Sequence, residues 1–331
     1  MKLSWGIIGC GDVAERKGGP ALYTAAHSQL VAVMRRDKAK AEDFAKRHGA
    51  RRAYDRVEEL LADPEINAVY VATPPYVHAE QTIMAAQAGK HVMCEKPMAM
   101  TVEEGQAMIA ASRANGVQLM IAYYRRRFPS VLKIKQLVEA GTIGQVVKAT
   151  VQIGTGFSPP DTPTKQWRLD PRIGGGGLLM DLGSHAIDLL HFFLGDVRDV
   201  AAFVDTVAND LEVENSSSLI LRFRNEGQAS VVVNQNVGVR CNVLTLGGTE
   251  GSLALVGGLG CSGVTLETAK GTQSFDLNRP PITHLGIVEN LVASVEKGDR
   301  NCVDGEEGLK TTKVLAAAYE SSARRSVVQI D

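Results

Sequence analysis

Residues 5–14 read WGIIGCGDVA, a short apolar run followed at once by a glycine-rich turn. The turn matches Gly-x-Gly-x-x-Ala, a pattern that indicates dinucleotide binding when it follows the first strand and begins the first helix. In that setting Gly9 makes the tight turn, Gly11 lets the backbone approach a pyrophosphate, and Ala14 allows close helix–strand packing. The stretch predicts a dinucleotide site formed by Gly9, Cys10, Gly11, Asp12 and Val13. The alternative is a plain tight turn.

The first third of the chain alternates apolar runs with helix-length intervals. Strands are expected at residues 5–8, 30–33, 68–72, 91–94 and 117–122. Helices are expected over 38–48 and 78–88, each ending before a glycine, and after the capping box Thr101-Val-Glu-Glu104. Because the strands are apolar throughout, we expect a parallel sheet covered on both faces, an α/β Rossmann domain.

Composition narrows the function class. The chain has 331 residues, 44% hydrophobic, and a formal net charge of −1, which fits two domains and gives no reason to expect a nucleic-acid or membrane partner. The five cysteines form no CxxC pair and are read as reduced thiols of a cytoplasmic protein. We see no signal sequence and expect no apolar stretch of membrane-spanning length, roughly 18–20 residues.

The end of the second expected strand bears on cofactor choice. It reads Val33-Met34-Arg35-Arg36-Asp37, with arginine where an NAD-binding unit usually has an acid. NADP is therefore favoured over NAD, through Arg35 and Arg36. The alternatives are a solvated basic turn, or a displaced Asp37 that still contacts a ribose.

The rest of the chain indicates a second fold class. Extended segments near 145–153, 197–205, 216–224, 228–236, 240–246, 252–256 and 263–268 follow one another without helices, as in an antiparallel sheet. Helices are expected over 128–139, 285–295 and 308–322. We predict two domains, 1–123 and 124–331.

Five motifs in order carry a resemblance to a known family: GCGDVA (9–14), ATPPYVHAEQ (72–81), GKHVMCEKPMA (89–99), GGGGLLMDLGSHAIDLL (174–190) and GTEGSL (248–253). Together they resemble the Gfo/Idh/MocA family of sugar and polyol oxidoreductases. The resemblance implies a Rossmann domain followed by an α+β domain with a large, mostly antiparallel open sheet. It also implies a terminal helix that packs back on the first domain, and dimers or tetramers formed through that sheet.

The resemblance also implies a catalytic set of Lys96, Asp181 and His185. Lys96, before a cis Pro97, would donate to the substrate oxygen, and His185 would be the general acid/base. Asp181, four residues earlier, would bind substrate hydroxyls or tune the imidazole. Asp181 as a helix N-cap is the alternative. No metal is expected, because no third ligand is placed by the sequence.

Supporting roles follow from the same motifs. The cofactor would be contacted by Thr73, Pro74, Pro75, His78, Glu95 and Lys96, although the family more often has Asn where Pro75 stands. The substrate would be contacted by Tyr124, Arg125, Trp167 and Arg168, with interdomain packing as the alternative. The glycine run 174–177 would let the backbone pass close to substrate and nicotinamide.

The expected function is an NADP-preferring oxidoreductase that moves a hydride to or from a carbinol or carbonyl carbon. The substrate class is a sugar, sugar derivative or cyclic diol. Two alternatives stay open: a redox-neutral glycoside-processing enzyme with a tightly bound cofactor, and a nicotinamide-binding regulatory protein.

Overall fold

The computed structural model describes residues 2–156 and 163–330. The chain divides into two compact units, the first formed by Met1–Tyr124 with Pro280–Leu309 and the second by Arg125–Arg279 with Lys310–Asp331. The first unit therefore includes Pro280–Leu309 from late in the chain. The predicted division at 123/124 assigns these residues to the second domain. The division into domains 1–123 and 124–331 stays a prediction.

The first unit contains a six-stranded parallel sheet in the order β3-β2-β1-β4-β5-β6. Its strands are β1 (Leu3–Ile8), β2 (Ser28–Met34), β3 (Arg52–Tyr54), β4 (Ala68–Val71), β5 (His91–Cys94) and β6 (Leu119–Ile121). The order reverses between β1 and β4, so the carboxyl ends of these two strands form the switch point at which such sheets bind ligands. The Rossmann prediction is confirmed; the short, half-buried β3 was not predicted.

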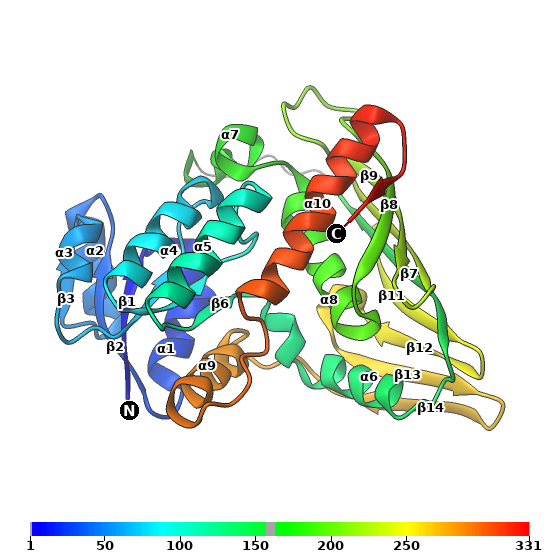
Figure 1. Cartoon of the computed structure of the whole chain (residues 1–331), viewed down its shortest axis with the longest axis horizontal. Coiled ribbons are helices and arrows are strands. Elements are labelled where there is room, and N and C mark those ends of the chain that lie inside the picture. The colour runs from blue at the N-terminus through cyan, green and yellow to red at the C-terminus, as the bar shows by residue number, and fades with distance from the viewer. Residues whose placement is uncertain (1, 157–162, 331) are drawn as a thin grey trace. The chain divides into compact units, whose positions relative to one another are not determined.

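Helices cover both faces of this sheet (Figure 1). They are α1 (Gly19–Thr24), α2 (Lys38–His48), α3 (Val57–Leu61), α4 (His78–Gln87), α5 (Val102–Ala114) and α9 (Leu285–Lys297). A π-helical turn, Ala14–Gly18, leads into α1, and a 3₁₀ turn, Pro75–Val77, leads into α4. The helix α9 packs against α1. The last helix of the chain is α10 (Gly305–Arg324), and the return of that helix to the first domain stays a prediction.

The capping box is confirmed with a shift of one residue. Thr101 caps α5 by accepting from the Glu104 amide at 3.2 Å, while the Glu104 carboxylate accepts from Met100 at 2.8 Å rather than from Thr101.

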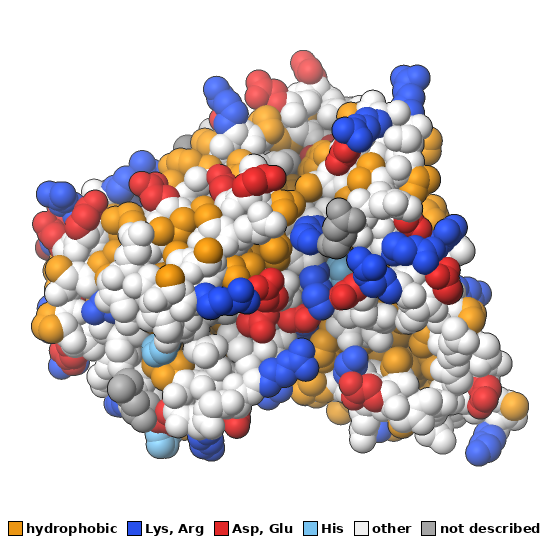
Figure 2. All heavy atoms as spheres, viewed as in Figure 1, with side chains coloured by type: hydrophobic (Ala, Val, Ile, Leu, Met, Phe, Trp, Pro, Cys, Tyr) orange, Lys and Arg blue, Asp and Glu red, His pale blue; other side chains and the backbone are white. Residues whose placement is uncertain are grey.

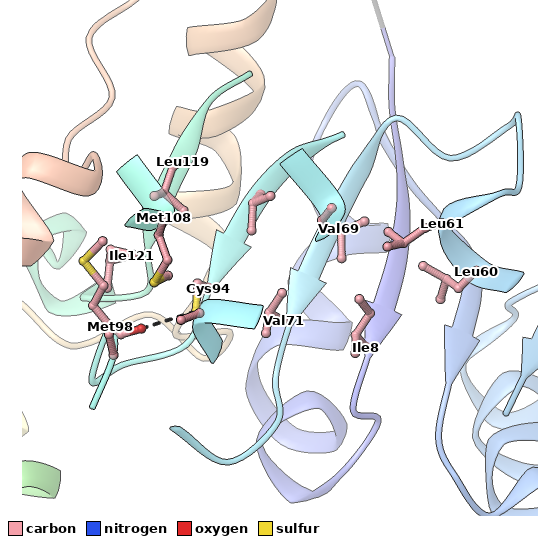
Figure 3. Close-up of a cluster of buried hydrophobic side chains, with 14 of the residues drawn as sticks. Ile8, Leu60, Leu61, Val69, Val71, Cys94, Met98, Met108, Leu119 and Ile121 are labelled. Atoms are coloured by element: carbon pink, nitrogen blue, oxygen red, sulfur yellow. Dashed lines mark hydrogen bonds between the residues drawn. The ribbon is translucent and has the colours of Figure 1, made fainter. Parts of the chain in front are cut away.

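The core of the first unit lies between the sheet and these helices. Figure 3 shows Ile8, Val69, Val71 and Cys94 projecting from β1, β4 and β5, with Met108 of α5 close by. These side chains are buried because a parallel sheet is packed on both faces.

The second unit contains a nine-stranded sheet in the order β14-β13-β12-β11-β7-β10-β9-β8-β15. All its pairings are antiparallel except that between β7 and β10. The strands are β7 (Val146–Thr155), β8 (Val197–Asp205), β9 (Ser216–Phe223), β10 (Gln228–Gln235), β11 (Cys241–Gly248), β12 (Gly251–Val256), β13 (Gly263–Thr268), β14 (Gly271–Asp276) and β15 (Val328–Gln329). The predicted mostly antiparallel sheet is confirmed.

Helices lie on one face of this sheet, where α6 contacts β12 and β13, and α8 contacts β7 (Figure 1). The helices of the second unit are α6 (Pro129–Glu139), α7 (Pro171–Gly174), which contacts the turn Pro163–Leu169 rather than the sheet, α8 (Ser184–Leu194) and α10 (Gly305–Arg324), which begins in the first unit and continues into the second after Leu309. Short 3₁₀ turns occupy Tyr124–Arg127, Pro163–Leu169 and Gly258–Gly260, and a π-helical turn occupies Leu179–Gly183.

One segment corrects the expectation about apolar stretches. Pro171–Leu194 is long and apolar enough in composition to cross a membrane, yet 72% of its most apolar window is buried within the protein. Core helices of globular proteins share this composition, so the segment is weak evidence for a membrane span.

Surface charge is mixed, as the balanced composition predicts. Figure 2 shows acidic and basic side chains interspersed over the viewed face. The five cysteines are all free thiols.

Candidate active site

The fingerprint loop follows β1 at the switch point. Gly9 has φ +90°, and a Cβ there would lie 2.6 Å from the Thr73 methyl group at the end of β4, so this position requires glycine. A Cβ on Gly11 would meet only the Gly9 carbonyl oxygen, at 4.0 Å. Gly11 therefore leaves the space that close approach of a pyrophosphate needs, and the residues present fit a dinucleotide.

The other loop residues have different surroundings. Cys10 is 1% exposed, and burial raises the pKa of its thiol to about 11, although the Arg35 charge opposes this. Asp12 is exposed and pairs with Arg16 at 3.1 Å. Val13 is half-buried at the start of the helical segment.

The basic turn after β2 contacts the same loop. The half-buried Arg35 donates from Nη1 to the Cys10 carbonyl at 3.2 Å, whereas Arg36 is exposed. Asp37 caps α2, accepting from the Lys40 amide at 3.2 Å, and pairs with the Lys40 ammonium at 3.0 Å. These contacts, the Lys40 side-chain contact first, lower the pKa of Asp37. The Asp37 carboxylate therefore already has partners at the N-terminus of α2.

The loop after β4 is braced by a buried histidine. Thr73 donates to Gln81 at 2.7 Å, and Pro74 and Pro75 lead into α4. His78 is 1% exposed, and its ring nitrogens lie 2.8 Å from the Thr73 carbonyl and 2.9 Å from the Pro97 carbonyl. His78 therefore joins the loops after β4 and β5, and burial lowers its pKa. The predicted cofactor contact of His78 stays a prediction.

Lys96 follows β5 and is supported by a buried acid. The Lys96–Pro97 bond is cis, as the resemblance implied. Glu95 is 5% exposed; it accepts from Tyr70 at 2.6 Å, from His284 at 2.9 Å and from the Lys96 amide at 3.2 Å. Burial alone would raise the pKa of Glu95, but the hydrogen bonds and charges around it, from His284 above all, lower it to about 2. Glu95 is thus a fixed anion inside the unit.

Tyr124 belongs to the same cluster. Its ring stacks on His284 with centroids 4.5 Å apart, and the Lys17 ammonium lies 5.4 Å from its centre. Tyr124 is 5% exposed, and its predicted contact with substrate stays a prediction.

Asp181 and His185 lie on one helical segment of the second unit. Asp181 lies within the π-helical turn, and His185, 3% exposed, lies in the first turn of α8. The caps of these two segments are Leu178 and Gly183, without side-chain capping bonds, so Asp181 is not an N-cap. π-Helical turns are frequent at functional sites.

A buried ion pair anchors α8. Arg126 is 2% exposed and donates from Nε to Asp188, three residues beyond His185, at 2.9 Å; its Nη2 lies 2.8 Å from the same carboxylate oxygen as an ion pair. His185 thus lies on a helix fixed by a charged pair.

The remaining predicted substrate residues also lie in the second unit. Arg125 donates to the Leu259 carbonyl at 3.0 Å. Trp167 is half-buried, and the exposed Arg168 guanidinium lies 4.6 Å from its ring centre. This is the aromatic–cation neighbour pair that the sequence indicated.

The predicted site residues thus form two groups. Gly9, Arg35, Thr73, Lys96 and Tyr124 follow the carboxyl ends of β1, β2, β4, β5 and β6, while Asp181 and His185 belong to the second unit. Sequence reasoning missed Tyr70 and His284, which donate to Glu95, and Glu214, whose carboxylate accepts from the Gly177 and Leu179 amides. No local pattern marks them, because each acts through a contact at least 25 residues away in the chain. Within residues 2–156 and 163–330, no three His, Cys, Asp or Glu side chains are grouped to hold a metal.

The chain matches family models for a Rossmann domain and for a following C-terminal domain. Residues 3–123 match the family described as "Oxidoreductase family, NAD-binding Rossmann fold", and residues 131–254 match the "GFO/IDH/MocA C-terminal domain". Oxidoreductase P35 of Formosa agariphila is 34% identical over 316 residues, covering 95% of this chain and 97% of that protein.

Two further relatives carry cofactor or substrate in their names. D-xylose 1-dehydrogenase (NADP(+)) 2 of Haloferax volcanii is 30% identical, over 99% of this chain and 100% of the relative. The solved structure of a levoglucosan dehydrogenase in complex with NADH and levoglucosan superposes with a TM-score of 0.90 at 25% identity, covering 100% of both chains. The chain therefore belongs to the Gfo/Idh/MocA family of NAD(P)-dependent oxidoreductases.

Proposed function

We propose that this protein is an NADP-preferring oxidoreductase that interconverts the carbinol and carbonyl forms of a sugar, sugar derivative or cyclic diol. The observation that carries the proposal is the support of Lys96 by the buried Glu95–His284 pair, at the edge of the sheet where the fingerprint loop lies. A regulatory protein has no need of a buried network beside Lys96. The relatives named for sugar oxidation support the substrate class.

The nicotinamide, when bound, supplies the hydride acceptor or donor. The chain must then move the hydroxyl proton and stabilise the developing alkoxide. We assign donation to the substrate oxygen to Lys96, whose backbone amide is held by Glu95 at 3.2 Å. We assign proton exchange to His185 and the orientation of substrate hydroxyls to Asp181, both on the segment that leads into α8.

The cofactor preference follows from the turn after β2. Arg35 and Arg36 supply positive charge, while Asp37 is used by the N-terminus of α2. Such a turn suits the extra phosphate of NADP better than a free ribose hydroxyl. The relative named D-xylose 1-dehydrogenase (NADP(+)) 2 supports the preference for NADP. The levoglucosan dehydrogenase was solved with NADH, so the preference needs a direct test.

We further propose a cytoplasmic homo-oligomer formed through the second sheet. Phe203 is 71% exposed, Ile220 54%, Val256 44% and Val243 38%, and alternation along the strands puts them on the face opposite the buried one. An apolar sheet face of this kind is typical of subunit contacts. Phe203→Glu should lower the mass measured by light scattering, whereas an unchanged oligomer would refute this part.

The function is tested by fluorescence titration with NADPH and NADH, followed by a panel of sugars, diols and carbonyl compounds. We expect tighter binding of NADPH and substrate-dependent change of the cofactor absorbance. Aglycone release without accumulation of reduced cofactor would favour the redox-neutral reaction. Cofactor binding without turnover of any compound would favour the regulatory role. Arg36→Ala should weaken NADPH binding about tenfold and leave NADH binding unchanged, with Lys46→Ala, at an exposed lysine of α2, as the control.

A further inference from the structure

The glycine run 174–177 packs against two residues that are distant in the sequence. A Cβ on Gly177 would lie 2.0 Å from the Glu214 carbonyl oxygen, and a Cβ on Gly176 would lie 2.1 Å from the Tyr319 hydroxyl. Both positions therefore require glycine because of protein neighbours, all within the second unit.

Glu214 binds three successive amides at the end of this run. Its carboxylate accepts from Gly177 at 2.6 Å and from Leu179 at 2.9 Å, and its backbone carbonyl accepts from Leu178 at 3.3 Å. Such N–H groups, at the start of a helical segment, have no partner within the helix. Glu214 supplies the partners from the residues just before β9.

This contact reaches the proposed catalytic residues through the backbone. The Gly177 carbonyl accepts from the Asp181 amide at 3.1 Å, and Asp181 lies in the π-helical turn that continues into α8 and His185. The position of Gly177 thus sets the start of the turn that carries both side chains.

Among the described residues, no lysine, arginine or histidine forms an ion pair with Glu214. Glu214 is 8% exposed, and burial raises its pKa although the Gly177 and Leu179 amides oppose this. A buried carboxylate in such surroundings adds little to stability. Its three contacts therefore fix geometry more than they stabilise the fold.

We propose that Glu214 is a positioning residue of the active site, which fixes Gly177–Leu179 and so holds Asp181 and His185 in the geometry that proton transfer needs. The proposal rests on the proposed function, because it assumes that these two residues act on substrate. Tyr319, beside Gly176, closes the other side of the same loop. A residue that only caps a helix would affect stability and leave turnover per folded molecule unchanged.

The test compares Glu214→Gln with Glu212→Gln, an exposed glutamate two residues earlier. Gln keeps the reach of the side chain and loses one of the two acceptors. We expect Glu214→Gln to lower kcat by tenfold or more, since small displacements of catalytic groups cost about that much or more. The dissociation constant for NADPH should stay within twofold, and Glu212→Gln should behave as wild type. A kcat within twofold of wild type in folded Glu214→Gln protein would overturn the proposal.

A second measurement does not depend on turnover. Amide hydrogen exchange of a peptide spanning 177–186 should be faster in Glu214→Gln and unchanged in Glu212→Gln, and equal exchange in all three proteins would overturn the proposal. If wild type turns over no substrate, the proposed function fails and this measurement still decides the role of Glu214. If Glu214→Gln does not fold, Tyr319→Phe replaces it, with faster exchange of the same peptide expected and unchanged exchange contradicting the proposal.

Discussion

Two glutamates of nearly equal burial differ in what surrounds them. Glu95 of the first unit is 5% exposed and Glu214 of the second is 8% exposed. Glu95 contacts the segment that carries Lys96, and Glu214 contacts the segment that carries Asp181 and His185. Each half of the proposed catalytic set therefore has its own buried carboxyl group.

Their partners give the two groups opposite properties. Side-chain donors, His284 and Tyr70, bind Glu95 and lower its pKa to about 2 against the effect of burial. Backbone amides bind Glu214, and burial raises its pKa despite them. Equal burial thus yields a stable anion in one unit and a disfavoured anion in the other, because the partner decides the balance.

Removing His284 should break this contrast most strongly. His284→Ala leaves a buried carboxylate without its main partner, which costs about 3–5 kcal/mol of the free energy of unfolding. Urea unfolding at pH 7 measures it. The control is His27→Ala, which removes an exposed histidine paired with Glu296 and should change little. Equal effects of the two variants would contradict the role of His284.

The pH dependence of Glu95→Gln sharpens the same contrast. The folded-state pKa of Glu95 is lower than that of an ordinary glutamate. The ionised Glu95 therefore stabilises the fold above the ordinary pKa of glutamate, and this stabilisation is lost as the pH falls toward about 2. The stability difference between wild type and Glu95→Gln should reach roughly 3 kcal/mol at neutral pH and shrink below about pH 4.5. A difference that does not vary with pH would refute the depressed pKa.

Tyr70→Phe removes one donor to Glu95 and leaves the ring in place. A hydrogen bond to a charged group contributes about 1.5–3 kcal/mol, so the variant should be destabilised by about that amount in thermal and urea unfolding. Tyr23→Phe, in which the lost hydroxyl lies on an exposed tyrosine, is the matched control. A loss no larger than that of the control would mean that Tyr70 does not support the anion.

Glu214→Gln should have the smallest effect on stability, on the order of 1 kcal/mol, with the opposite pH trend to Glu95→Gln. A group with a raised folded-state pKa contributes stability at low pH, and this is lost as pH rises through the raised value. The variant should therefore gain stability relative to wild type between pH 4 and 7. A relative loss over that range would place Glu214 in the same class as Glu95.

Much of this architecture could be predicted from the sequence. The strand His91–Cys94 and the helix Lys38–His48 occur where apolar runs and Gly49 indicated them. These features depend on local periodicity and caps, which a single sequence displays. The short β3 was missed because its three residues are only half-buried.

The surroundings of the site were less predictable, because they depend on contacts between distant residues. The cofactor contact predicted for Glu95 stays a prediction, and its partners His284 and Tyr70, far away along the chain, were not predicted. Glycines 176 and 177 were assigned to ligand approach, yet Tyr319 and Glu214 explain them. The π-helical turn at Asp181 could not be predicted either, because the i, i+4 spacing of Asp181 and His185 is equally compatible with a regular α-helix.

The central proposal is that Lys96 and His185 are both catalytic residues of the same reaction. A double-mutant cycle with Lys96→Met and His185→Ala in kcat/KM tests it, with His191→Asn, on the same helix, as the control. Each single variant should lose about 10²–10⁴-fold, and the double variant should lose no more than roughly the worse single, as residues acting as a unit do. Losses that multiply in the double variant, or normal turnover in either single variant, would contradict the account.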